Sequence, residues 1–286
     1  GSNTHNVAGS WDDQGGTFTP TNGTIIFSGD SKTITTAGGN NFYGFTIAGT
    51  GNLTTGSSLD VNGQSNILAS GKLSVGSDDV DFGPTQQCNI AGELELSTAT
   101  VVSHGSLNAN GGTIRFTDAG ILQISGITPD LGTLIPHTGT VVYDFGGPGT
   151  QNIFNTTYNN LEIDGSDEKR GPIGNLVVNG NLEVKNGDLT FAANNTTLDL
   201  TGNFLISGGT FTAGTSASHD VDGNFTINGG SVILNSSIID INGNWNDVGG
   251  TLTAGTGTVS LSGGSGTTIS TANANSFNNL TIAASG

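Results

Sequence analysis

Hydrophobic and polar residues alternate along most of the chain, and glycine and asparagine interrupt the alternation at regular intervals. The clearest segments read "TLDLTGNFLISGG" from Thr197, "SHDVDGNFTINGG" from Ser218 and "IIDINGNWNDVGG" from Ile238. A period of two residues is typical of a β-strand with one buried and one exposed side. Glycine and asparagine tolerate positive φ angles, so the Gly-Asn and Gly-Gly pairs predict turns between short strands.

These turns recur with a short period. Gly-Asn pairs begin at Gly180, Gly202, Gly223 and Gly243, so the successive steps along the chain are 22, 21 and 20. A repeat of this length holds two or three short strands but no core of its own, so each repeat must stack on its neighbours. The sequence therefore predicts an all-β fold, a parallel β-solenoid with about 21 residues per coil. The usual hand of parallel connections further predicts a right-handed β-helix.

A longer repeat is superimposed on the short one. Its motif reads "GTIIFSGDSKTITTAGGNNFYGFTIAG" from Gly23, "GTVVYDFGGPGTQNIFNTTYNNLEIDG" from Gly139 and "GTVSLSGGSGTTISTANANSFNNLTIAASG" from Gly257. The spacing of roughly 117 residues predicts a single solenoid domain over residues 1–286, built of about two long repeats. Because the chain begins and ends inside this pattern, we expect it to continue in a longer array or to associate head to tail with other copies.

Stacking places equivalent residues of successive coils above one another. The corner residues that follow the repeated glycines are Asn181, Asn203, Asn224 and Asn244. We expect their amides to form a hydrogen-bonded ladder along the solenoid, with a structural role. Trp11 and Trp245 occupy matching positions in "GSWDDQGGTF" and "GNWNDVGGTL", which favours packing over an isolated sugar-stacking platform.

The single cysteine, Cys88, lies in the alternating segment "CNIAGELEL". Its place in the pattern matches Leu59, Leu198 and Ile239. We therefore predict a buried, unreactive thiol at this position.

Composition and charge narrow the range of partners. The chain has a formal net charge of −17, and only 6 of its 286 residues are lysine or arginine. Phosphate backbones and anionic lipid surfaces are bound through such cations, so we expect no nucleic-acid partner and no docking on a membrane surface. No apolar run is long enough to span a bilayer, so we also expect no membrane insertion.

Carboxylates gather at several places along the chain. The segment "SDDVDFG" contains Asp78, Asp79 and Asp81, which form a candidate Ca²⁺ site; the alternative is an exposed acidic turn. The segment "DGSDEKRG" from Asp164 has the composition of a solvated loop.

A further set of carboxylates, Asp199, Asp220 and Asp240, recurs at nearly the same step as the Gly-Asn pairs. Stacking would bring these side chains into one row, where like charges repel. Plain solvation, raised pKa values or a bound cation would each relieve that repulsion.

The sequence offers no catalytic residues and no cofactor-binding motif. Polysaccharide-cleaving β-helices need an acidic cluster with a base or a charge-neutralising cation, and lysine and arginine are scarce here. The segments "GNWNDVGGTLTAGTGTV" and "GNLEV" resemble the repeats of very large secreted bacterial β-helical proteins, distantly similar to filamentous haemagglutinins and autotransporter passengers.

That resemblance implies an extracellular or cell-surface location and a rod-like structural or adhesive role. Examples of such a role are a stalk, a surface-layer component or a filament subunit. Surface glycans are the ligands that adhesion would involve. The alternative function class is a carbohydrate-binding or polysaccharide-cleaving β-helix.

Overall fold

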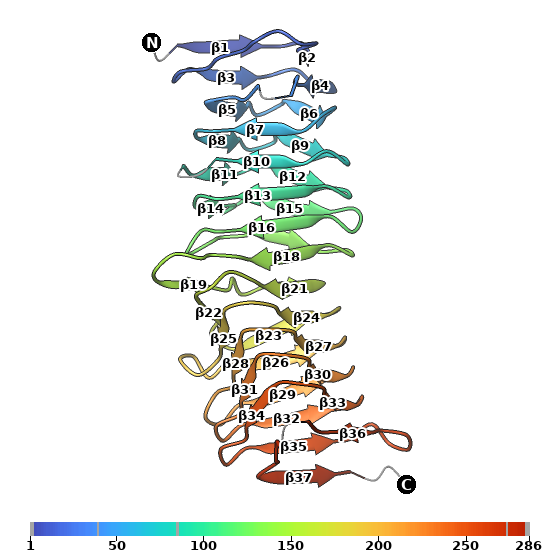
Figure 1. Cartoon of the computed structure of the whole chain (residues 1–286). Helices are drawn as coiled ribbons and strands as arrows, with labels where there is room; N and C mark the ends of the chain where they lie inside the picture. The colour runs from blue at the N-terminus through green and yellow to red at the C-terminus, as the bar shows by residue number, and fades with distance from the viewer. Residues whose placement is uncertain (1–2, 39, 84–85, 273, 284–286) are drawn as a thin grey trace. The chain divides into compact units, whose positions relative to one another are not determined.

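The computed structural model describes residues 3–38, 40–83, 86–272 and 274–283 (Figure 1). Within these ranges the chain has strands and turns but no helix, and the strands stack in parallel about 20 residues apart. The predicted all-β parallel solenoid is confirmed, with about 14 turns. Its handedness stays a prediction.

The chain divides into two compact units, Gly1–Val141 and Val142–Gly286. In the described residues, no helix has the length and hydrophobicity needed to cross a membrane.

Unit 1 has three faces of parallel strands, and along each face the strands follow one another in chain order. Face A contains β1 (Thr4–Val7), β3 (Thr24–Phe27), β5 (Gly44–Ile47), β8 (Ser65–Ile67), β11 (Cys88–Ile90) and β14 (Leu107–Asn108). Face B contains β2 (Trp11–Asp12), β4 (Lys32–Thr35), β6 (Asn52–Thr55), β9 (Lys72–Val75), β12 (Glu93–Leu96), β15 (Thr113–Phe116) and β17 (Thr133–Ile135). Face C contains β7 (Leu59–Val61), β10 (Val80–Phe82), β13 (Thr100–Ser103) and β16 (Ile121–Ile124).

Unit 2 is built in the same way. Face D contains β19 (Thr150–Asn152), β22 (Glu168–Arg170), β25 (Asp188–Thr190), β28 (Thr210–Thr212), β31 (Ser231–Ile233) and β34 (Thr251–Thr253). Face E contains β20 (Thr157–Tyr158), β23 (Asn175–Val178), β26 (Thr197–Leu200), β29 (Ser218–Val221), β32 (Ile238–Ile241), β35 (Thr258–Leu261) and β37 (Asn279–Ile282). Face F contains β18 (Thr140–Tyr143), within which the division between the units falls, and β21 (Asn160–Ile163), β24 (Leu182–Val184), β27 (Phe204–Ile206), β30 (Phe225–Ile227), β33 (Trp245–Asp247) and β36 (Ile269–Ser270).

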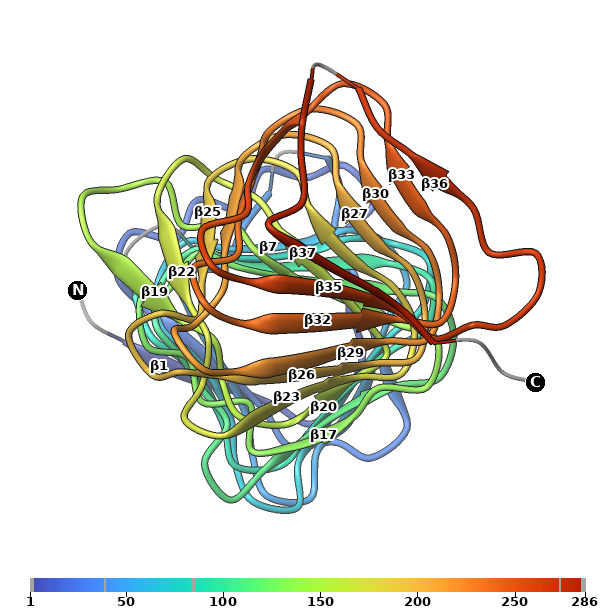
Figure 2. The same ribbon diagram turned by 90° about the horizontal axis from the view of Figure 1, so that it is seen from below.

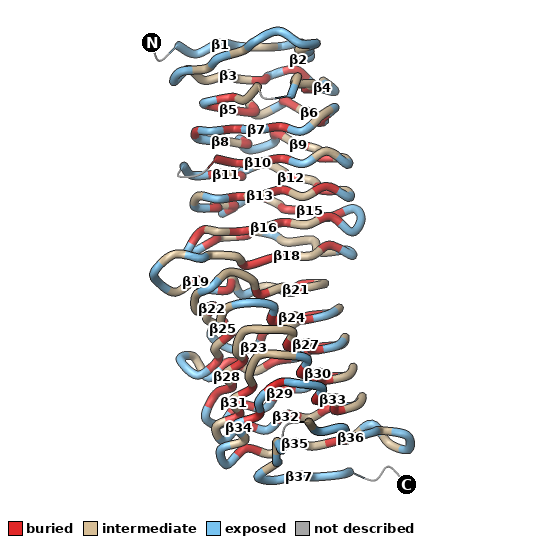
Figure 3. Tube along the Cα trace, viewed as in Figure 1, coloured by how far each residue is buried: buried red, intermediate tan, exposed pale blue. Residues whose placement is uncertain are grey.

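Along each face, the strand register places residues of similar type above one another. On face F the inward residues of consecutive strands are Leu182, Phe204, Phe225 and Trp245, and all four are fully buried. The rings of Phe225 and Trp245 are parallel within 10°, with their centroids 4.9 Å apart. Figure 3 shows the result, buried residues alternating along the strands with intermediate or exposed ones. The packing role predicted for Trp245 is confirmed.

Trp11 also packs, although it stays half-exposed. Its ring meets those of Phe18 and Phe42 edge to face, at centroid distances of 5.1 and 5.2 Å. Edge-to-face contact is a preferred geometry for aromatic pairs, so this tryptophan too serves the core.

The Gly-Asn corners need glycine for a reason other than the predicted one. None of Gly202, Gly223 and Gly243 has a positive φ. Instead, a Cβ added to Gly223 would lie 2.4 Å from the carbonyl oxygen of Gly202, and one added to Gly243 would lie 2.4 Å from that of Gly223. Successive coils therefore approach too closely for any side chain at this corner. Positive φ is found at the Gly-Gly corners, for example 55° at Gly209.

The predicted asparagine ladder is confirmed. In each step, Oδ1 of one corner asparagine accepts a hydrogen bond from the backbone N–H of the corner asparagine in the next coil. The pairs and distances are Asn181 to Asn203 at 3.0 Å, Asn203 to Asn224 at 2.9 Å, and Asn224 to Asn244 at 2.9 Å. The ladder begins one coil earlier than predicted, because Oδ1 of Asn160 accepts from the N–H of Asn181 at 2.9 Å.

Cys88 is buried, as predicted, with 1% of its surface exposed. Burial raises the pKa of its thiol to about 12. The predicted equivalence with Leu59 is wrong, because Cys88 lies on face A between Ser65 and Leu107, whereas Leu59 lies on face C. The separation of these two residues along the chain is not a whole number of coils.

Candidate functional site

A groove of about 680 Å³ lies on unit 1, along the outer side of β7, β10 and β13. We call it the acidic groove. Its polar lining residues are Thr36, Asn40, Ser57, Ser58, Asp60, Asp78, Asp79, Asp81 and Thr100. Strands of face C line it, together with the turn residues Ser57, Ser58, Asp78 and Asp79 that precede them and with Thr36, Ala37, Gly38 and Asn40 of the coil before.

Two carboxylates meet in this groove on neighbouring strands. Asp60 of β7 and Asp81 of β10 are partners in the parallel register, so their side chains leave the same side of face C. Burial raises the pKa of Asp60, and the charge of Asp81 raises it further. Oδ2 of Asp81 lies 3.4 Å from Nε2 of His104, while its Oδ1 is shielded from solvent and has no hydrogen-bond partner among the described residues.

The three aspartates predicted to bind Ca²⁺ all line the acidic groove, but they do not converge on one point. Oδ1 of Asp79 accepts a hydrogen bond from the backbone N–H of Thr100 at 2.8 Å, and Asp81 faces His104. Within the described ranges, no three His, Cys, Asp or Glu side chains come together closely enough to hold a metal ion. The geometry therefore gives the cation site at Asp78, Asp79 and Asp81 no support.

The sequence-based prediction missed one carboxylate of this groove, Asp60. The signal for it is present, since Asp60 precedes Asp81 by one coil length. Both residues occupy the middle, outward position of an alternating three-residue strand.

The predicted row of carboxylates on unit 2 is confirmed. Asp199, Asp220 and Asp240 are register partners on face E. Burial raises the pKa of Asp220, and the charges of Asp222, Asp240 and Asp199 raise it further. The row thus raises the pKa of Asp220, and a cation bound along it stays a prediction.

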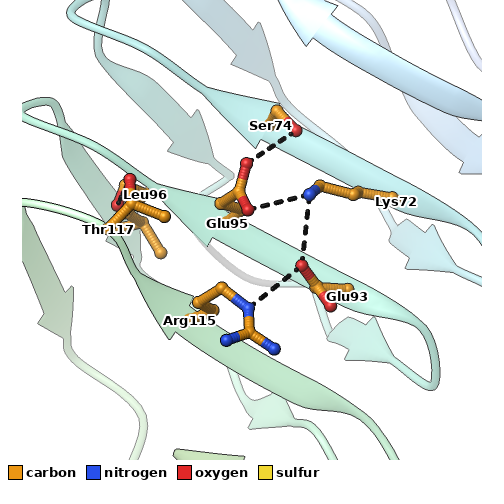
Figure 4. A network of polar contacts seen from close by, with 7 residues as sticks. All are labelled: Lys72, Ser74, Glu93, Glu95, Leu96, Arg115 and Thr117. Carbon is orange, nitrogen blue, oxygen red and sulfur yellow. Dashed lines mark hydrogen bonds and ion pairs between the residues drawn. The ribbon is translucent and has the colours of Figure 1, made fainter. Parts of the chain in front are cut away.

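Two basic residues on face B, Lys72 and Arg115, are engaged with glutamates (Figure 4). Nζ of Lys72 lies 2.8 Å from Oε2 of Glu95 and 3.2 Å from Oε1 of Glu93, and Nε of Arg115 lies 3.3 Å from the same Glu93 oxygen. Ser74 Oγ donates to Glu95 Oε1 at 3.2 Å. Since these groups are on β9, β12 and β15, the network joins three consecutive coils, which is a structural role.

The segment around Lys169 is not the solvated loop that its composition predicted. Residues Glu168–Arg170 form β22, and Lys169 points into the core with no exposed surface. Its Nζ donates to the backbone carbonyl oxygens of Phe145, Gly165 and Asp167 at 2.8, 3.0 and 3.0 Å. Burial lowers the pKa of this ammonium group, and nearby aspartates oppose that effect. Three carbonyls therefore take the place of water around one buried charge.

Two further polar groups are buried in unit 2. The hydroxyl of Tyr143 contacts that of Tyr158 at 2.8 Å, and both also bond to the backbone of Phe154, so the hydrogen-bonding groups of the pair are satisfied within the protein.

His219 has no exposed surface, and neither ring nitrogen has a hydrogen-bond partner among the described residues. It lies 5.5 Å from the ring centre of Phe191, and burial lowers its pKa to about 4.

Comparisons with protein-family models, with characterised proteins and with solved structures gave no match for this chain.

Proposed function

We propose that the chain is a non-catalytic structural module of the extracellular space or the cell surface, such as a stalk, a surface-layer component or a filament subunit. The observation that carries this proposal is the asparagine ladder of unit 2. The same side-chain oxygen binds the next coil at every step from Asn160 to Asn244. Each of these coils thus offers the same hydrogen-bond acceptor, an asparagine Oδ1, to the coil that follows it.

Such a ladder suits a structural module that is lengthened by the addition of further coils. When each coil contacts only its neighbours, stability is close to a sum over coils and their interfaces. The buried ammonium of Lys169 and the tyrosine pair support the same proposal, because their polar atoms bind groups of the protein itself. The resemblance to repeats of secreted bacterial β-helical proteins supports the extracellular location.

A deletion of one whole coil tests the structural proposal. Removing residues 204–224 joins Asn203 to Phe225, which is the register partner of the deleted Phe204. We expect the shortened chain to keep an all-β circular dichroism spectrum and cooperative unfolding. Removing only residues 204–214 moves the following strands to the wrong face, and we expect unit 2 to lose its ordered stacking. A whole-coil deletion that unfolds unit 2 as completely as the half-coil deletion would contradict the proposal.

A second candidate function is the binding or cleavage of polysaccharides in the acidic groove. It is favoured by the paired Asp60 and Asp81, since glycoside hydrolysis uses two carboxylates and a raised pKa suits the acid of the pair. The structural proposal predicts no release of reducing ends from plant, fungal or bacterial polysaccharides. Cleavage that is lost in Asp60→Asn and in Asp81→Asn, with the fold intact, would establish the second function instead.

A further inference from the structure

Seven Asn-Gly pairs occur in the chain, and the structure gives them different surroundings. They begin at Asn22, Asn62, Asn110, Asn179, Asn186, Asn228 and Asn242. In such a pair the backbone nitrogen of the glycine can attack the side-chain amide carbon of the asparagine, and a glycine has no Cβ to hinder that approach. The local chemistry is the same in all seven pairs, so differences between them must come from the tertiary structure.

The pair Asn110–Gly111 lies in the turn between β14 and β15, where the chain passes from face A to face B. The N–H of Gly112 donates to the carbonyl oxygen of Ala109 at 2.8 Å, and the N–H of Asn110 donates to Oδ1 of Asn108 at 3.1 Å. These bonds hold the turn on both sides of the pair. The side-chain amide of Asn110 and the N–H of Gly111 have no hydrogen-bond partner within the described ranges.

This turn is also open to solvent. The glycines of all seven pairs are described, and Gly111 is the only one of them that is exposed. A Cβ added to Gly111 would have no described atom within 4 Å. The glycine borders an open depression of about 370 Å³, through which water reaches the turn. The reacting atoms of this pair therefore have both room to close a ring and water to complete the reaction.

Three of the other pairs are held by hydrogen bonds. The N–H of Gly180 donates to the carbonyl oxygen of Asn159 at 2.7 Å, so the attacking nitrogen of that pair is occupied. Nδ2 of Asn186 donates to Oδ1 of Asp164 at 2.6 Å, which fixes the amide that would be attacked. In the pair of Asn242 both the side-chain amide and the glycine N–H are bonded.

The remaining three pairs are confined by the coil before them. A Cβ added to Gly63, Gly229 or Gly23 would lie 2.0, 2.5 or 3.0 Å from a backbone carbonyl oxygen of that coil. Figure 2 shows the surroundings of the second of these, because β30, the strand before Gly229, lies between β27 and β33. A corner packed this closely leaves little space for the backbone to rotate into a ring.

From these observations we infer that Asn110 is a site of spontaneous deamidation, and that it reacts before the other six pairs in the folded chain. The nitrogen of Gly111 gives its proton to a solvent base and bonds to Cγ of Asn110. The bond from Cγ to Nδ2 breaks, and ammonia leaves. Water then opens the five-membered ring at one of its two carbonyls, which yields aspartate or isoaspartate.

The net reaction consumes one water, releases one ammonia and adds one negative charge. It is independent of the proposed structural function. Where a hydrogen bond of about 1 kcal/mol must break before the attack, the rate falls about fivefold. We therefore expect Asn110 to convert at least about fivefold faster than the hydrogen-bonded pairs.

The test follows each pair separately in the folded chain. The whole protein is incubated at pH 8, digested with pepsin in acid, and the peptides are weighed by mass spectrometry, since conversion adds about one mass unit. A parallel incubation in denaturant removes the tertiary structure. Isoelectric focusing of the intact chain follows the added charge in two variants, Asn110→Gln and the control Asn179→Gln. Both asparagines have exposed side chains, and circular dichroism establishes that each variant is folded.

We expect Asn110 to convert first in the folded chain, and the seven pairs to convert at similar rates in denaturant. The early acidic shift should disappear in Asn110→Gln and persist in Asn179→Gln. Equal rates at all seven pairs of the folded chain would overturn the inference, because the structure would then make no difference. Earlier conversion at any other pair, or an Asn110 that converts only in denaturant, would overturn it as well.

Discussion

Oδ1 of Asn203 accepts two hydrogen bonds from Asn224 of the next coil, one from the backbone N–H at 2.9 Å and one from Nδ2 at 3.2 Å. The same pair of bonds joins Asn181 to Asn203 and Asn224 to Asn244. These corners lie between strands, where the chain turns from face E to face F, and backbone bonds such as that from Gly223 N–H to the Gly202 carbonyl at 3.1 Å still join the coils there. The asparagine side chains therefore add a second set of hydrogen bonds between coils at the corner.

Replacing Asn203 by alanine should destabilise unit 2. The substitution removes both bonds that Asn224 donates to Asn203 and the bond from Asn203 Nδ2 to Asn181 Oδ1. A typical net hydrogen bond contributes about 0.5–1.5 kcal/mol. Because the corner is open to water, we expect a loss of about 1–2 kcal/mol in the free energy of unfolding, measured by urea denaturation. Asn228→Ala is the control, since Asn228 is also exposed and makes no side-chain bond in the ladder. Equal losses in the two variants would contradict a structural role for the ladder.

Replacing Lys169 by methionine should have a larger effect. Methionine fills similar space but leaves the carbonyl oxygens of Phe145, Gly165 and Asp167 without their donor. Each unsatisfied buried polar group costs about 1–3 kcal/mol, so we expect a loss of roughly 3 kcal/mol or more. Lys185→Met is the matched control, because Lys185 has a half-exposed side chain and a surface ion pair with Glu162. That control should lose less than about 1 kcal/mol in the same denaturation experiment.

His219 should make unit 2 sensitive to acid. Its pKa is about 4 in the folded chain against an ordinary value of 6.5, so between these values the unfolded state binds more protons. The stabilising effect of the neutral ring is complete above pH 6.5 and is lost as the pH falls to about 4. The loss amounts to roughly 3 kcal/mol. In His219→Leu, which matches Leu198 and Ile239 in the ladder, this part of the pH dependence should vanish. The prediction would be wrong if the melting temperatures of the two proteins changed with pH in the same way.

Cys88 should react with a thiol reagent only after the protein unfolds. The side chain is 1% exposed and burial raises its pKa to about 12, so neither access nor thiolate is available in the native state. We expect slow labelling by a chromogenic disulfide at pH 8 and rapid labelling of one thiol in denaturant. Fast labelling of the native protein would place the residue on the outward side of β11.

Alternation and spacing were sufficient to predict the solenoid, the corner ladder and the carboxylate row of face E. In each case the side chains concerned are partners one coil apart, so their distance along the sequence is also their relation in space. The steps from Asn181 to Asn203 and from Asn203 to Asn224 are examples. Asp60 and Asp81 of the acidic groove are also partners one coil apart, so their pairing could have been predicted from the same spacing.

The environment of Lys169 could not be predicted in this way. The local string "SDEKRG" carries charges of both signs, which is typical of a solvated surface. Its burial follows from the register of β22, in which Lys169 stacks between Gln151 and Leu189. The three carbonyl groups that make this burial tolerable come from two separate turns of the backbone.

By itself, the sequence determined that the chain coils with the step of its Gly-Asn repeat, because strand alternation and close-packed glycine corners are local properties that recur. Only the tertiary structure decided on which face each segment lies. The long motif shows this, since its copy at Val141 is on face F and its copy at Val259 is on face E. The stretch of chain between these two valines is not a whole number of coils, so equal sequences end on different faces. The face on which a segment lies depends on the summed lengths of all the turns before it. That sum cannot be read from any local sequence pattern.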